Sequence, residues 1–160
     1  MSAARYELVP MRPSHLDEVS GIELESYENP WTKSAFESEL GKNPVSWSRV
    51  ALTTETPARV AGYCVAWVVF EHLHIQNVAV HPEHRRQGLG RLLVLRALEE
   101  GRARGVAAAL LEVRRSNEVA QKLYRKLGFL EAGTRRDYYS QPREDALLFR
   151  KELGGAPGEL

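Results

Sequence analysis

The chain has 160 residues, which is enough for one domain that buries its own hydrophobic core. Its 43% hydrophobic and 27% charged residues and its net charge of +1 argue against a nucleic-acid-binding protein with a strongly basic surface. No apolar stretch approaches the roughly 20 residues that cross a bilayer, the first residues lack a signal-peptide core, and one cysteine, Cys64, excludes an internal disulfide. We therefore expect a cytoplasmic protein with neither a membrane nor a nucleic-acid partner.

The first half of the chain predicts a strand, two helices and an antiparallel hairpin. Ser14 and Asp17 have the spacing of a capping box, which indicates the start of the first helix. Asn29-Pro30 interrupts this helix, because the residue before a proline avoids helical angles. The strands are expected at residues 6–11, 47–52 and 60–70, and the second helix at residues 31–40.

The next strand changes the phase of its apolar residues. Leu73 and Ile75 occupy odd positions, whereas Val78 and Val80 occupy even ones. Such a change is typical of a β-bulge, here near residues 76–77, because one extra residue moves the following side chains to the other face. The alternative is a central strand that is buried on both faces and has no phase to change.

A candidate anion-binding site follows, where residues 78–91 pass from this strand through a basic turn into a helix. Gly88 and Gly90 allow a tight turn that exposes backbone N–H groups. The helix expected at residues 91–104 directs its own unpaired N–H groups to the same place. Added positive charge comes from Arg85, Arg86 and Arg91. The expected ligand is a phosphate or pyrophosphate.

The turn matches neither of two common nucleotide-binding motifs. The dinucleotide fingerprint needs a glycine where Leu93 stands, and no P-loop motif occurs in the chain. A plain connecting turn with a solvated basic rim therefore remains an alternative at this stage.

The second half of the chain predicts further strands at residues 107–113, 129–133 and 146–151. A helix at residues 117–127 would bury Val119, Leu123 and Leu127 and end at Gly128. Tyr138 and Tyr139 would lie in the loop between the last two strands.

Two side chains in this half are candidates for proton transfer. Glu112 ends an apolar strand, where loss of solvation would raise its pKa and make it a better base. Tyr124 lies at the edge of the buried helix stripe, where its phenol can face a cleft. Taken singly, a strand-end glutamate is usually solvated and a helical tyrosine usually packs in the core.

The five histidines do not form a recognisable metal site. His72 and His74 share one strand face, and His81 and His84 flank the basic turn. No accompanying motif supplies the further ligands that a four-coordinate site needs. We expect no metal.

Three motifs together resemble, in chain order, those of the GNAT superfamily of acetyl-CoA-dependent N-acetyltransferases. They are Arg85-x-x-Gly88-x-Gly90, Leu111-Glu-Val-Arg-x-Ser-Asn117 and Leu123-Tyr-x-x-Leu-Gly-Phe129. More narrowly, the chain is similar to bacterial ribosomal-protein-alanine N-acetyltransferases of the RimI type, in Pro30-Trp31, Glu112-Val-Arg-x-Ser-Asn117, Arg135-Arg-Asp-Tyr-Tyr139 and Arg143-Glu-Asp-Ala146. The resemblance covers residues 6–153.

The resemblance implies a fold and a set of site residues. The fold would be a single α/β (α+β) domain over residues 1–153, with a mixed, mostly antiparallel sheet of six to seven strands, about four helices and a bulged central strand, followed by a flexible tail at residues 154–160. Acetyl-CoA would be held by Val78, Ala79, Val80, Arg86, Gln87, Gly88, Leu89, Gly90, Arg91 and Asn117. Glu112 would be the general base, Tyr124 the general acid, and Tyr138 and Tyr139 would bind the acceptor.

The implied reaction is direct attack of an N-terminal alanine amine of a ribosomal protein on the acetyl-CoA thioester. An α-amine with a pKa of about 7.8 is neutral in roughly one molecule in seven at pH 7, so it needs less help than a lysine. Alternatives are acetylation of small-molecule amines or protein lysines, or a CoA-binding module without catalysis.

Overall fold

The computed structural model describes residues 5–41, 43–140 and 142–154. These residues form one sheet of seven strands with four α-helices, which confirms the expected fold class. In chain order the elements are β1 (Tyr6–Pro10), α1 (Leu16–Ser26), α2 (Lys33–Gly41), β2 (Ser46–Thr53), β3 (Val60–Val69), β4 (His72–Val80), α3 (Leu89–Ala103), β5 (Ala108–Arg114), α4 (Glu118–Lys126), β6 (Leu130–Tyr139) and β7 (Glu144–Glu152). Residues 155–160 of the expected tail lie outside the described residues. No helix in the described ranges is long and apolar enough to span a membrane.

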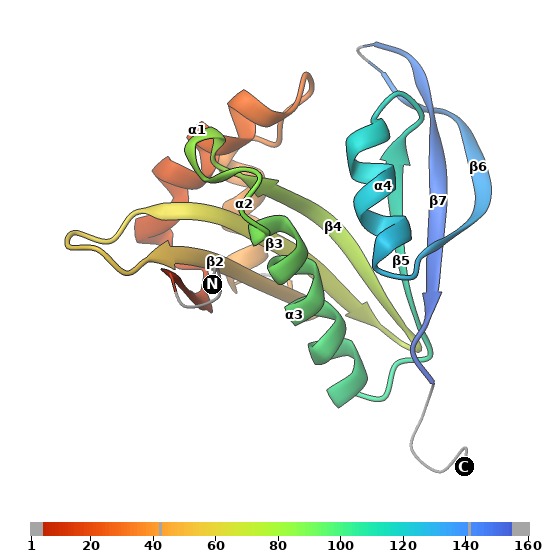
Figure 1. The fold of residues 1–160 in the computed structure, drawn as a ribbon, viewed down its shortest axis with the longest axis horizontal. Coiled ribbons are helices and arrows are strands. Elements are labelled where there is room, and N and C mark those ends of the chain that lie inside the picture. The colour runs from red at the N-terminus through yellow and green to blue at the C-terminus, as the bar shows by residue number, and fades with distance from the viewer. Residues whose placement is uncertain (1–4, 42, 141, 155–160) are drawn as a thin grey trace.

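The sheet has the strand order β1-β2-β3-β4-β5-β7-β6. All neighbouring strands are antiparallel except β4 and β5, which are parallel. Only three residue pairs join these two strands, from His72↔Ala108 to His74↔Leu110. Figure 1 shows β4 and β5 starting side by side and then spreading apart. We call this opening the fork, and it divides the sheet into two halves.

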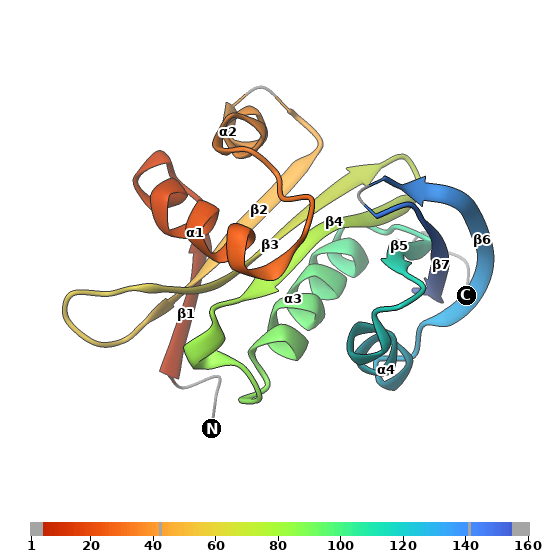
Figure 2. The same ribbon diagram turned by 90° about the horizontal axis from the view of Figure 1, so that it is seen from above.

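Helices cover both faces of the sheet. α1 and α2 lie on one face, and α3 and α4 lie on the other (Figure 2). Leu89, Leu93 and Leu98 of α3 are buried in the larger core cluster, whereas Val19 of α1 and Phe36 of α2 are buried in the second cluster. Because helices cover both faces of the sheet, a ligand can reach backbone groups in the middle of the sheet at the fork.

The expected bulge is present in β4. Val65 of β3 pairs with Asn77 and the next residue, Ala66, pairs with Ile75, so Gln76 is the extra residue. Ile75 before the bulge and Val78 after it pack on the same α3-side core, as the change of phase predicts. The alternative was also partly right, because both faces of β4 are covered.

The capping box at Ser14 and Asp17 is wrong. Residues Pro13–His15 form a 3-10 turn, and α1 begins only at Leu16. The backbone N–H of Arg12 donates to Nδ1 of His15 at 3.0 Å. The imidazole, not a carboxylate, therefore reaches back to the start of this segment.

Two expectations for the second half also need correction. Val119 is 82% exposed, because α4 starts at Glu118 and its first turn projects beyond the core. Tyr124 is buried instead, and it belongs to the packed stripe of the helix. Tyr138 and Tyr139 are not in a loop, since β6 extends through Tyr139. Gly128 has φ +95°, in agreement with its expected place after the helix.

Candidate active site

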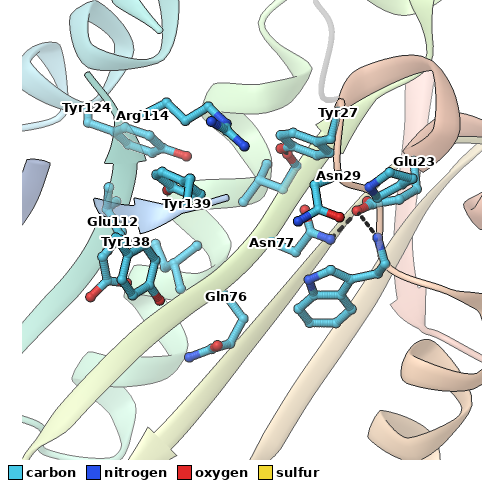
Figure 3. Close-up of a pocket in the computed structure, with 15 residues that line it drawn as sticks. Glu23, Tyr27, Asn29, Gln76, Asn77, Glu112, Arg114, Tyr124, Tyr138 and Tyr139 are labelled. Carbon is cyan, nitrogen blue, oxygen red and sulfur yellow. Dashed lines mark hydrogen bonds between the residues drawn. The ribbon is translucent and has the colours of Figure 1, made fainter. Parts of the chain in front are cut away.

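A pocket of about 440 Å³ opens at the fork. Its walls come from α1 and the following loop, from β4 around the bulge, from β5 and α4, and from the end of β6 (Figure 3). Five of the predicted site residues line it, namely Val78, Glu112, Tyr124, Tyr138 and Tyr139. Segments more than 100 residues apart along the chain thus converge on one cavity, which is the arrangement expected of a binding or catalytic site.

Glu112 is held by two basic side chains. Its side chain is 8% exposed, its Oε1 lies 2.7 Å from Nε2 of His74, and its Oε2 accepts a hydrogen bond from Nε of Arg135 at 3.1 Å. Burial pushes the pKa of the carboxyl up, but His74 and Arg135 outweigh it and the net pKa is lowered. The expected rise in pKa is therefore wrong, because the sequence did not show these two partners.

Tyr124 combines a buried ring with a hydroxyl that points into the pocket (Figure 3). Its ring packs edge-on against Phe129, with centroids 5.7 Å apart. Burial raises the pKa of the phenol, so that the hydroxyl stays protonated across the neutral pH range. A protonated phenol can donate a hydrogen bond or a proton to a group in the pocket.

Tyr138 and Tyr139 form an aromatic pair at the end of β6. Their ring centroids are 5.0 Å apart, and Tyr138 is 51% exposed. The guanidinium of Arg114 lies over the Tyr139 ring at 4.2 Å and pairs with Glu144 at 3.1 Å. Burial raises the pKa of Tyr139 to about 12. The pair therefore presents neutral hydroxyls and ring faces to the pocket.

A buried polar cluster that the sequence did not suggest forms the wall opposite Glu112 (Figure 3). Glu23 of α1 accepts hydrogen bonds from the Tyr63 hydroxyl at 2.5 Å, from Nδ2 of Asn77 at 2.9 Å and from the backbone N–H of Trp31 at 2.9 Å. The sequence does contain one signal for this cluster. Glu23 is at helical spacing from Leu16 and Val19, which places a carboxylate on the buried face of α1.

The basic turn lies beside the pocket, at the start of α3. Gly88 has φ +81°, a backbone conformation that favours glycine, and Arg86 has φ +63°. A Cβ on Gly90 would lie 3.8 Å from Val80 and 3.8 Å from Leu123. The turn thus lies where β4, α3 and α4 meet, next to the fork.

Residues 16–129 match the model of the acetyltransferase (GNAT) family. The chain belongs to the GNAT acetyltransferase family. This acetyltransferase is 41% identical over 138 residues to a Bacillus subtilis protein assigned provisionally as a ribosomal protein bS18-alanine N-acetyltransferase, with 86% of this chain and 89% of that protein covered.

Two solved structures have the same fold as this acetyltransferase. The crystal structure of the ribosomal-protein-S18-alanine N-acetyltransferase from Escherichia coli gives a TM-score of 0.83 at 33% identity, covering 97% of this chain and 98% of that one. Arabidopsis thaliana NAA60 in complex with acetyl-CoA gives 0.81 at 16% identity, covering 92% and 98%. At that low identity the plant structure supports the fold alone.

Not every predicted site residue of the acetyltransferase lines the pocket. Ala79, Val80, Asn117 and residues 86–91 lie outside its lining. Oδ1 of Asn117 accepts the N–H of Ala120 at 3.1 Å, so this side chain caps α4. Its predicted contact with a cofactor stays a prediction.

The backbone of β4 faces the fork at alternate residues. The carbonyl of Val78 accepts a hydrogen bond from the Tyr27 hydroxyl, and the carbonyl of Val80 accepts one from Nε of Arg85 at 2.9 Å. The N–H of His81, by contrast, donates to Ala61 of β3 at 2.8 Å. Because the N–H and C=O of one strand residue point to the same side, Val78 and Val80 direct their N–H groups to the fork.

The described residues offer no clear metal site. Within residues 5–41, 43–140 and 142–154, no three histidine, cysteine or acidic side chains are close enough to hold a metal ion together. His74, which shares a face of β4 with His72, lies beside Glu112.

Proposed function

We propose that this chain transfers the acetyl group of acetyl-CoA to the α-amine of an N-terminal alanine of a ribosomal protein. The observation that carries the proposal is the convergence of Glu112, Tyr124 and the Tyr138-Tyr139 pair on one pocket at the fork. The names of the similar B. subtilis and E. coli proteins support the choice of acceptor. A protein of this kind acts in the cytoplasm, where ribosomes assemble.

In this proposal acetyl-CoA lies along β4 and ends at the basic turn. The pyrophosphate binds the backbone N–H groups at the start of α3, together with the charges of Arg86 and Arg91. The pantetheine arm lies along Val78, Ala79 and Val80, where the N–H groups of Val78 and Val80 face the fork and can bind its amide oxygens. Further contacts of the cofactor are proposed at Gln87, Gly88, Leu89, Gly90 and Asn117. No metal takes part.

Glu112 acts as the base in this reaction, directly or through a water. Its lowered pKa makes it a weak base that is always ionised at neutral pH. A weak base is enough, because the nitrogen becomes much more acidic once it has attacked the carbonyl carbon. The N–C bond forms, the C–S bond breaks, and the proton leaves the nitrogen for the carboxylate.

Tyr124 acts as the acid that meets the departing sulfur. Its raised pKa keeps the hydroxyl protonated, so it is ready to donate to a thiolate as negative charge develops there. Tyr138 and Tyr139 bind the backbone of the acceptor with their hydroxyls and rings.

The direct test compares acceptors in an acetylation assay with purified protein. We expect turnover of a peptide that starts with alanine, and none of the same peptide when its α-amine is blocked and only an internal lysine is free. Turnover of polyamines or aminoglycosides alone would contradict the proposal.

The assigned roles are tested by Glu112→Gln and Tyr124→Phe. Each variant should lower kcat about 100-fold, the usual range for loss of a general acid or base, while acetyl-CoA binding stays unchanged. Full activity in both variants would show that the base and acid are assigned wrongly. A protein that binds acetyl-CoA but acetylates no amine would instead be a CoA-binding module.

A further inference from the structure

Three charged side chains line the pocket, and two of them are neutralised. Glu112 pairs with Arg135 and His74, and Arg114 pairs with Glu144. The third is Glu23. Within the described ranges no lysine, arginine or histidine forms an ion pair with it. The pocket therefore carries one negative charge that the described protein does not balance.

The carboxylate of Glu23 is buried among hydrogen-bond donors. The residue is 1% exposed, and both carboxylate oxygens face hydrogen-bond donors. All three donors are neutral: the Tyr63 hydroxyl, the Asn77 amide and the Trp31 backbone N–H. They stabilise an anion without cancelling its charge. A buried ion without a counter-ion is unfavourable, so a cationic ligand in the pocket would relieve this cost.

The ligand of the proposed function carries such a charge. An α-amine with a pKa of about 7.8 is protonated in most molecules at pH 7, so the acceptor usually arrives as an ammonium ion. Resting on the proposed function, we infer that Glu23 is a specificity-determining residue that attracts the α-ammonium group of the acceptor into the pocket. The bound ammonium loses one proton to solvent before the neutral amine attacks, and Glu112, on the opposite wall in Figure 3, takes the second proton once the nitrogen has attacked.

Glu23 acts through its field and not as a base. Its oxygens already accept three hydrogen bonds, which leaves it poorly placed to take a proton from the acceptor. A unit charge acting across several ångströms of a partly dry pocket changes affinity by roughly tenfold or more. Its contribution therefore falls on binding of the acceptor, and binding of acetyl-CoA should not depend on it.

The test measures binding of two peptides that differ only in the charge of the N-terminus. One starts with alanine, and the other starts with a propionyl group, which has the same carbon skeleton without the amine. Calorimetric titrations are done with the full chain saturated with CoA, so that no acetyl transfer can occur. The wild-type protein should bind the alanine peptide at least about tenfold more tightly.

Glu23→Gln should abolish this preference, with little effect on the affinity for the propionyl peptide or for CoA. Glu25→Gln is the matched control, because it removes the same charge from an exposed position two residues away on α1. It should keep the preference. A purely structural role of Glu23 would weaken both peptides equally, and that result would overturn the inference.

A melting curve shows whether Glu23→Gln folds. If it does not fold, the wild-type measurement alone still tests the inference. Equal affinity of the wild-type protein for both peptides overturns the inference by itself. Such a result would leave the proposed function intact, provided that alanine peptides are still acetylated. Failure of the proposed function has a different signature, namely no acetylation of any peptide N-terminus.

Discussion

Glu112 shows how neighbouring residues decide what a carboxyl group can do. Burial alone raises the pKa of its carboxyl group, and the two basic partners reverse this effect. The pair of bonds also fixes the carboxylate at the wall of the pocket, so orientation and charge come from the same contacts. A base that is weak but always ionised suits an amine that becomes acidic during the reaction.

The pH profile of Arg135→Gln tests this balance. Without the guanidinium, burial weighs more and the pKa of Glu112 rises. Since only the ionised carboxylate is active, the steeper part of the acidic limb of kcat/KM, which lies below the pKa of the α-amine, should move to higher pH. Arg136→Gln, the exposed neighbour, should leave the limb in place. An unmoved limb in Arg135→Gln would show that Arg135 does not act on the base.

At the scale of elements, the contact between β3, β4 and α3 depends on one missing side chain. A Cβ on Gly62 would lie 2.9 Å from the carbonyl oxygen of Ala79 and 3.2 Å from Leu93. The close approach of the β4 backbone and of Leu93 to β3 at this position therefore requires a glycine. This close contact fixes the position of β4, the strand that contains the bulge and forms one side of the fork.

Two Gly→Ala substitutions should change stability in opposite directions. Gly62→Ala should lower the free energy of unfolding by about 1–3 kcal/mol through overpacking. Gly21→Ala, in α1 with nothing within 4 Å of the new methyl group, should raise it by about 0.5–1 kcal/mol because alanine favours the helix. Urea denaturation of both variants measures the difference. Equal effects would show that the contact at Gly62 relaxes freely.

The elements that could be predicted are those with a local signal. The bulge could be predicted because Leu73 and Val78 are an odd number of residues apart in one strand and still face the same core. The full length of β6 was not visible, since this edge strand is mostly exposed and shows no apolar alternation. Glu23 was missed because its three partners come from β3, β4 and a loop, and no local pattern records such a cluster.

The whole molecule consists of two halves of a sheet joined at a short seam. Three residue pairs between β4 and β5 connect the halves before the fork opens. The proposed base and acid belong to the β5–β7 half, whereas the bulge, the basic turn and Glu23 belong to the other. A ligand that fills the fork therefore touches both halves at once.

Binding of acetyl-CoA should stabilise both halves together. At a ligand concentration 100 times Kd, the free energy of unfolding should rise by about 2.7 kcal/mol. Hydrogen exchange should slow at backbone amides of β4 and at those of β5. Slower exchange in β4 alone would show that the cofactor does not bridge the fork.

The backbone of β4 has a consequence for mutation of the site. The groups that Val78 and Val80 offer to the fork belong to the main chain, and every amino acid except proline carries the same N–H. Exchange of these valines for other residues of similar size leaves the binding groups in place. The binding groups in this part of the site therefore depend on the backbone conformation of β4. Most single substitutions at these two positions should leave them unchanged.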